Sequence, residues 1–160
     1  MRIGLYQFAS SNRISDNMNH ICRAVNGAAA QSVRLLVFHE CALCGYPPLE
    51  TAVNDIHVEE VEEALWQIGN LARQNRMFIA VGTVRFEGEK RLNAMAVIGE
   101  DGKPAGFYDK KMCIRDRPLL VRRAWTGTAG STQCPAMVVQ GTSRTRSSGG
   151  GAVPLSLIHI

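Results

Sequence analysis

Residues 35–48 read LLVFHECALCGYPP, and this stretch decides the fold. Residues 33–38 form a nearly continuous apolar run rich in Val and Leu, which is typical of a central strand buried on both faces. The run stops at His39-Glu40, and the Gly-Tyr-Pro-Pro that follows predicts a turn. Glu40 therefore stands where a buried strand ends. It is either an ordinary solvated residue or a chemical group held on a rigid edge.

On both sides of this strand the apolar pattern switches between the spacing of strands and that of helices. Helices are expected at about residues 16–31, where Ser15 or Asp16 can serve as the cap, and at 58–75. The loop at 85–90 makes its two flanking strands a hairpin. The order β-α-β-α-β-β-β predicts a layered α/β protein. The strands are expected at residues 2–9, 33–38, 77–84, 91–99 and 104–110.

The composition is that of a soluble globular protein. The chain has 160 residues, of which 46% are hydrophobic and 20% charged, enough for one domain with a core. No apolar run has the ~20 residues that a membrane-spanning helix needs, and the N-terminus lacks the pattern of a signal peptide. The five cysteines are an odd number at uneven spacing, which is a poor disulfide framework. These features indicate the cytoplasm.

The charge divides the chain near residue 111. Residues 1–110 carry 11 Lys and Arg against 13 Asp and Glu, whereas residues 111–160 carry 7 against a single acid, a net charge of +6. The second part is irregular and includes the low-complexity run SRTRSSGGGAVP. It is either a disordered basic tail or a sequence that has left its true reading frame. We favour the second, because residues 112–160 agree with no fold and the residues before them agree with one.

Two residues are candidates for catalysis. Glu40 would be a general base on the carboxyl edge of an α/β sheet, where ligand sites tend to lie. Lys110 ends another predicted strand, and a lysine beside an acid can stabilise a developing oxyanion. Taken singly, each is more often a solvated surface residue.

The cysteines at 41 and 44 form a C-x-x-C pair. A thioredoxin-like dithiol would open a helix, but the Gly-Tyr-Pro-Pro that follows disfavours one. A zinc site would need two more ligands at regular spacing, and His20, His39 and His57 do not provide it. We expect neither a metal nor a cofactor.

Taken together, several motifs carry a resemblance to a known family. They are the opening strand RIGLYQF, the helix containing AVNGAAA, the segment VRLLVFHECALCGYPP, and NAMAVIGEDGKPAGFYDK with Asn93 and a final Tyr-x-Lys. In this order and spacing they resemble the N-terminal half of the nitrilase, or carbon–nitrogen hydrolase, superfamily, over about residues 1–111. The predicted domain organisation is therefore an N-terminal part of such a domain at 1–111 and an irregular basic tail at 112–160.

The resemblance implies an α-β-β-α sandwich of the nitrilase type, incomplete in this chain, and a Glu-Lys-Cys triad. Glu40 matches the family's general base. Lys110 matches the family's lysine, whereas Lys111 has the wrong offset from Tyr108. We expect the Lys110 ammonium to lie within a few Å of the Glu40 carboxylate, because both strand ends would face one pocket.

The family's nucleophile is missing from its expected context. Cys113 is too close to Lys110, and Cys134 precedes a short apolar run instead of following one. Neither is assigned the role, so the nucleophile stays unidentified and the 160-residue chain is expected to be truncated and inactive.

The function implied is hydrolysis of a non-peptide C–N bond in a small amide, N-carbamoyl compound or nitrile. The full-length parent is expected to be a homo-oligomer, with no nucleic-acid or membrane partner. Two alternatives stay open. The chain could be a non-catalytic half-domain that binds or assembles through exposed sheet edges, or the +6 tail could bind nucleic acid or a membrane surface, with steep salt dependence.

Overall fold

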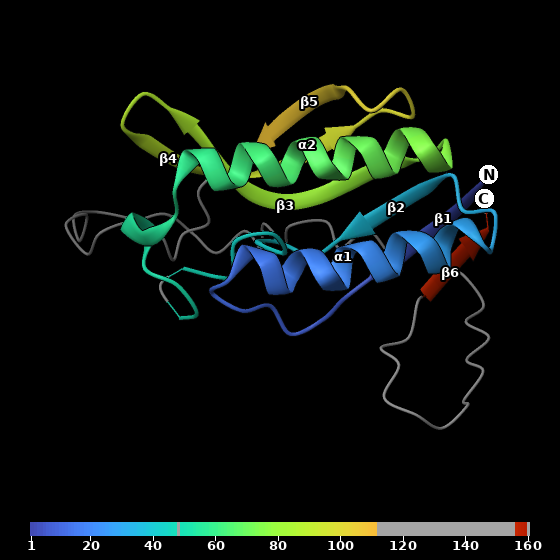
Figure 1. The fold of residues 1–160 in the computed structure, drawn as a ribbon, viewed down its shortest axis with the longest axis horizontal. Helices are drawn as coiled ribbons and strands as arrows, with labels where there is room; N and C mark the ends of the chain where they lie inside the picture. Colours follow the sequence, from blue (N-terminus) through green and yellow to red (C-terminus); the bar gives the residue numbers. More distant parts are fainter. Residues whose placement is uncertain (48, 112–155, 160) are drawn as a thin grey trace, which may run out of the picture. The chain divides into compact units, whose positions relative to one another are not determined.

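A computed structural model describes residues 1–47, 49–111 and 156–159. The described strands form one mixed sheet in the order β5-β4-β3-β2-β1-β6 (Figure 1). No helix among the described residues is long and apolar enough to cross a membrane. The elements are β1 (Arg2–Tyr6), α1 (Ile14–Ala29), β2 (Leu35–Phe38), the 3-10 turn η1 (Val53–Asp55), α2 (Val58–Asn75), β3 (Phe78–Glu87), β4 (Lys90–Ile98), β5 (Pro104–Asp109) and β6 (Ser156–His159).

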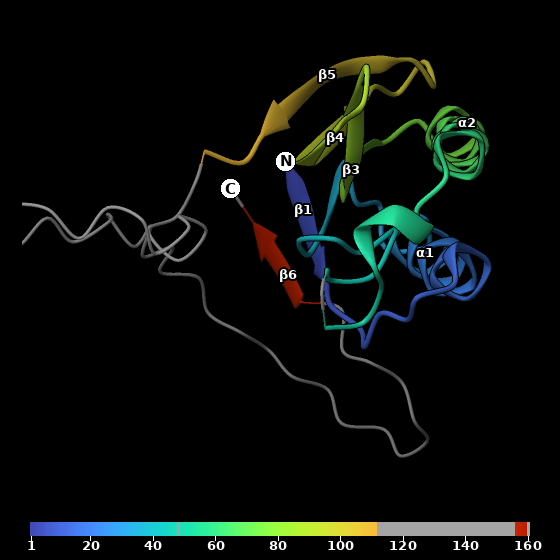
Figure 2. The same ribbon diagram turned by 90° about the vertical axis from the view of Figure 1, so that its left-hand side faces the viewer.

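The centre of the sheet is parallel. β2 pairs in parallel with both β1 and β3, and a helix makes each crossover. Because successive crossovers of one hand step across the sheet in one direction, α1 and α2 lie on the same face. Figure 2 shows both helices on one side of the sheet. The carboxyl ends of β1, β2 and β3 consequently meet at one edge, where an α/β protein builds its ligand site.

The core lies between the two helices and this face of the sheet. Its members are apolar residues at the helical spacing of α1 and α2 and at alternate positions of the strands. They include Ile21, Val25 and Ala28 of α1, Val61, Ile68 and Ala72 of α2, and Leu36, Phe38, Ile79, Val81, Ala96 and Ile98 of the sheet.

The opposite face of the sheet is also apolar. The register aligns Leu5 with Val37 and Leu35 with Phe78, so that these side chains share the face away from the helices. Leu5 and Phe78 are 39% and 38% exposed. Both described helices lie on the other face. A strand with apolar side chains on both faces is typical of a sheet that is covered on both sides. The continuous apolar run at 33–38 predicts such a strand.

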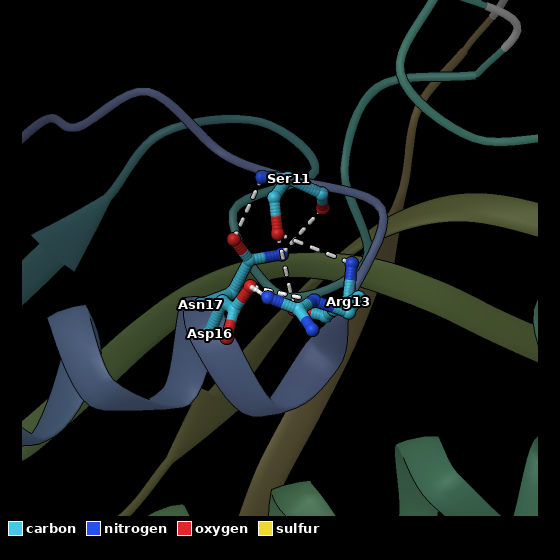
Figure 3. A network of polar contacts seen from close by, with 4 residues as sticks. All are labelled: Ser11, Arg13, Asp16 and Asn17. Atoms are coloured by element: carbon cyan, nitrogen blue, oxygen red, sulfur yellow. Dashed lines mark hydrogen bonds and ion pairs between the residues drawn. The ribbon is translucent and has the colours of Figure 1, made fainter.

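The first helix begins earlier than expected. It starts at Ile14 with Arg13 as N-cap, so the prediction that Ser15 or Asp16 caps it is wrong. The reason is a side-chain contact between the first turn of the helix and the loop directly before it. Asn17 is 1% exposed, accepts a hydrogen bond from the Ser11 amide at 2.8 Å and donates to the Ser11 carbonyl at 2.8 Å. Figure 3 shows this network with the Arg13–Asp16 ion pair beside it.

The hairpin is confirmed, with a tighter turn than expected. β3 and β4 pair antiparallel out to Glu87 opposite Lys90, which leaves two residues for the turn. Gly88 has φ +58°, the conformation that a two-residue hairpin requires at this position.

The region after residue 111 holds one described strand. β6 pairs antiparallel with β1 at the sheet edge, so the expectation of an irregular segment is wrong for residues 156–159. The open edge of β1 offers unpaired backbone N–H and C=O groups with which an extended segment can pair. The hydrophobic pattern of residues 156–159 does not predict this pairing. The remainder of the predicted tail, 112–155 and 160, lies outside the described residues, as do Cys113 and Cys134.

Candidate active site

Glu40 lies two residues beyond β2, in a tight turn held against β3. Cys41 has φ +56°, a left-handed conformation that reverses the chain directly after the glutamate. The amide of Leu43 then donates to the carbonyl of Gly82 in β3 at 2.9 Å. From the other side, Asn17 of α1 donates to the Leu43 carbonyl at 3.0 Å. The turn that carries Glu40 is thus fixed by the sheet and by a helix.

A glycine in β3 permits this close approach. A Cβ atom added at Gly82 would lie 2.4 Å from the carbonyl oxygen of His39 and 2.5 Å from the amide nitrogen of Cys41. Any larger residue would collide with the backbone of the Glu40 turn.

Lys110 immediately follows β5, at the end of a strand two places from β3 in the sheet. Its Nζ lies 2.8 Å from Oε1 of Glu40. The expected proximity of the two side chains is therefore confirmed. The contact joins residues 70 positions apart and brings a carboxylate and an ammonium together at one edge of the sheet.

Asn93 of β4 completes the group. Its side-chain Nδ2 donates to Oε1 of Glu40 at 2.6 Å, and its main-chain oxygen accepts a hydrogen bond from the amide of Lys110 at 2.8 Å. Strand alternation turns Asn93 away from the core face of β4, on which Ala94 lies. One residue therefore contacts both candidate catalytic residues.

A second ion pair holds the end of β5. Arg85 of β3 donates to the two carboxylate oxygens of Asp109 at 2.8 and 2.6 Å, a bidentate arrangement. These hydrogen bonds lower the pKa of the Asp109 carboxyl. Asp109 directly precedes Lys110, so the pair restrains the strand end from which the lysine projects.

The surroundings favour the charged form of Glu40. The hydrogen bond from Lys110 is the largest influence and, with that from Asn93, holds the pKa of the Glu40 carboxyl below its ordinary value, against a smaller opposing effect of burial. Glu40 is therefore a carboxylate at neutral pH, able to accept a proton.

This lowered pKa predicts how stability depends on pH. The Glu40–Lys110 pair stabilises the fold above the ordinary glutamate pKa of about 4.3, and the contribution disappears as the pH falls through the lower pKa of the folded state. We expect about 0.2–1 kcal/mol, because 43% of the Glu40 side chain is exposed and solvent screens the pair. Urea unfolding between about pH 7 and pH 3 measures it.

The matched variant is Glu40→Gln. The pKa values of Glu50 and Asp109 are also lowered, so only the difference between the unaltered protein and Glu40→Gln isolates the pair. That difference should shrink toward acid pH. A difference that stays constant over the whole range would contradict the assignment.

The cysteines among the described residues are poor nucleophiles. Burial raises the pKa of Cys41 to about 12, and it also raises the pKa values of Cys22 and Cys44. Cys41 follows Glu40 in sequence but is only 1% exposed. Over residues 1–47, 49–111 and 156–159, no group of three or more His, Cys, Asp or Glu side chains could hold a metal ion.

Comparison with known proteins places these residues in a family. The family model for carbon-nitrogen hydrolases matches residues 2–149. The chain belongs to the carbon–nitrogen hydrolase family. The match continues beyond residue 111, where the resemblance noted in the sequence ends.

Among curated proteins, the chain is 34% identical over 103 residues to a glutamine-dependent NAD(+) synthetase of Synechocystis sp.. The aligned part is 61% of this chain and 18% of that protein. The chain therefore corresponds to a small part of this relative.

Solved structures support the same fold. An amidase from Nesterenkonia sp. superposes with a TM-score of 0.62 at 27% identity, covering 69% of this chain and 42% of the amidase. A variant of the Nesterenkonia sp. AN1 amidase in complex with butyramide gives a TM-score of 0.64 at 26% identity, covering 71% and 44%. The described α/β sheet with its two helices thus resembles the N-terminal portion of a nitrilase-fold amidase, and the chain spans less than half of these enzymes.

Sequence reasoning brought forward Glu40 and Lys110 but assigned no role to three residues that support them. Asn93 was noted only as part of a motif, while Gly82 and Asn17 were not noted. A glycine inside an apolar strand is a signal for close backbone approach, and it could have indicated Gly82. No local signal marks Asn17, because its partners lie on two loops.

Proposed function

We propose that Glu40 and Lys110 are the general base and the oxyanion stabiliser of a Glu-Lys-Cys hydrolase that cleaves the C–N bond of a small amide. The observation that carries this proposal is the 2.8 Å contact between the Lys110 ammonium and the Glu40 carboxylate at the carboxyl edge of the sheet. A solvated pair of unrelated surface residues would not converge from two strand ends.

The chemistry needs both charges. A thiol has an ordinary pKa near ~8.5 and is mostly protonated at neutral pH, so a carboxylate must accept its proton as it attacks the amide carbon. The carbonyl oxygen then gains negative charge, which a fixed ammonium stabilises. When the C–N bond breaks, the protonated Glu40 returns its proton to the departing nitrogen. A water molecule, deprotonated by the same carboxylate, hydrolyses the thioester.

The thiol itself is placed outside this chain. Cys41 and Cys44 are buried and Cys22 is partly buried, and all three have raised pKa values. Cys113 and Cys134 stand in the wrong sequence context for the family's nucleophile. The proposal is that a longer product of the same gene carries the nucleophile.

The substrate class proposed first is a primary carboxamide. The Nesterenkonia amidase binds butyramide and acrylamide in its solved complexes, and the Synechocystis relative is glutamine-dependent. Each of these molecules contains a carboxamide. N-carbamoyl compounds and nitriles present a similarly electrophilic carbon and are the alternative substrates.

Ammonia release measures the proposed activity. The longer product should release ammonia from acetamide, butyramide or glutamine, whereas the 160-residue chain should release none because it lacks the nucleophile. A parallel panel of N-carbamoyl amino acids and nitriles distinguishes the substrate classes. An inactive longer product would count against the function, and thiol-dependent turnover by the 160-residue chain would show that one of its own cysteines acts.

A further inference from the structure

The two oxygens of the Glu40 carboxylate have different surroundings. Both hydrogen bonds that the described residues donate to the carboxylate end on Oε1, one from Lys110 Nζ at 2.8 Å and one from Asn93 Nδ2 at 2.6 Å. An oxygen that already accepts two donors is a weaker proton acceptor than its partner, because protonation would disrupt one of these bonds. The proton is therefore expected on Oε2.

We propose that Asn93 is a positioning residue that, with Lys110, occupies Oε1 of Glu40 and leaves Oε2 to carry the proton during catalysis. The role of Asn93 in catalysis rests on the proposed function, whereas its hydrogen bond to Glu40 does not. Asn93 acts through Glu40 and needs no contact with the substrate.

The main chain of Asn93 also positions Lys110. Its main-chain oxygen accepts the Lys110 amide at 2.8 Å, so the register between β4 and the end of β5 places the lysine beside the same carboxylate that the Asn93 side chain contacts. The contact requires a side chain with a hydrogen-bond donor at this position. Aspartate has a similar shape but offers oxygens, and it would repel Glu40.

Among the described residues, a small set of titratable groups lies beside Glu40. Lys110 faces its carboxylate, the buried Cys41 thiol follows it, and the His39 ring lies with Nδ1 2.9 Å from its main-chain oxygen. With a pKa of about 12, Cys41 stays neutral across the acid range. Asn93 does not titrate, so a change at Asn93 alters Glu40 through a lost hydrogen bond.

The test uses the 160-residue protein, with glutamate labelled by ¹³C at the side-chain carboxyl. Carboxyl chemical shifts are followed as the pH is varied, and Glu40→Gln identifies the Glu40 signal. Asn93→Ala should raise the Glu40 titration midpoint by about 0.5–1 pH unit, on the order of one lost hydrogen bond. The matched control is Asn75→Ala, which removes an asparagine that donates within α2 to the Leu71 carbonyl at 2.9 Å. It should leave the midpoint unchanged.

A second variant keeps the proposal testable if Asn93→Ala fails to fold. Asn93→Asp preserves the shape but places two carboxyl groups together, so one of them should titrate well above its ordinary value. An unchanged Glu40 midpoint in folded Asn93→Ala, or ordinary midpoints for both carboxyls in Asn93→Asp, would overturn the proposal. A moved midpoint supports it whether or not the longer gene product is active, so its failure and that of the proposed function are distinguishable.

Discussion

Glu40→Gln and Lys110→Ala are each expected to reduce amide turnover by the longer gene product at least ~10²-fold in kcat/KM. Loss of a single oxyanion donor typically costs 10²–10³-fold in rate, and loss of the base leaves the thiol protonated. Because base and lysine contact one another at 2.8 Å and act on the same reacting centre, their effects should not add. The double variant should be about as inactive as either single one, measured as the rate of ammonia release at a carboxamide concentration well below KM.

A surface ion pair of similar geometry provides the control. Arg34 lies 2.6 Å from Glu100, and both side chains are about half exposed. Glu100→Gln removes an equally short charge contact away from the Glu40 carboxylate and should retain normal turnover. Near-normal turnover in Glu40→Gln or in Lys110→Ala would remove that residue from the mechanism. The other would then need a different partner.

Gly82→Ala is expected to disturb the Glu40 turn although it adds a single methyl group. The new Cβ would lie 2.4 Å from the His39 carbonyl oxygen and 2.5 Å from the Cys41 amide, both backbone atoms that cannot rotate away. Relieving this overlap requires the turn to move from β3, which breaks the bond between the Leu43 amide and the Gly82 carbonyl. The expected loss is about 1–3 kcal/mol in the free energy of unfolding.

Two measurements check this prediction together. Urea unfolding gives the stability, and the Glu40 carboxyl midpoint should rise toward its ordinary value as the glutamate leaves Lys110 and Asn93. Gly106→Ala in β5 is the control, because a Cβ there meets no atom within 4 Å. If Gly82→Ala retained both its stability and its low Glu40 midpoint, the close approach would not position the turn.

Much of the fold could be predicted from the sequence because its signals are local. The apolar run at 33–38, the helical spacing at 58–75 and the hairpin between residues 77 and 99 each depend on neighbours within one element. The structure places α2 at Val58–Asn75 and confirms the hairpin. The start of α1 could not be predicted from apolar spacing, because hydrogen bonds from a helix side chain to the loop before the helix decide it. Asn17 of α1 binds the Ser11 backbone and so moves the helix start.

The candidate site divides in the same way. By itself the sequence placed Glu40 after an apolar strand, because a charged residue that follows an apolar run is visible in one dimension, and placed Lys110 at the end of another predicted strand. Only the tertiary structure decided that Oε1 of Glu40 accepts hydrogen bonds from both Lys110 and Asn93. It also decided that Gly82 lets the Glu40 turn approach β3, and that Asn17 donates a hydrogen bond to this turn from α1. These contacts join residues 26 to 70 positions apart in the chain. Residues this far apart in the chain come into contact only after the strands have paired in order and the helices have packed across the sheet. No local sequence pattern can therefore specify these contacts.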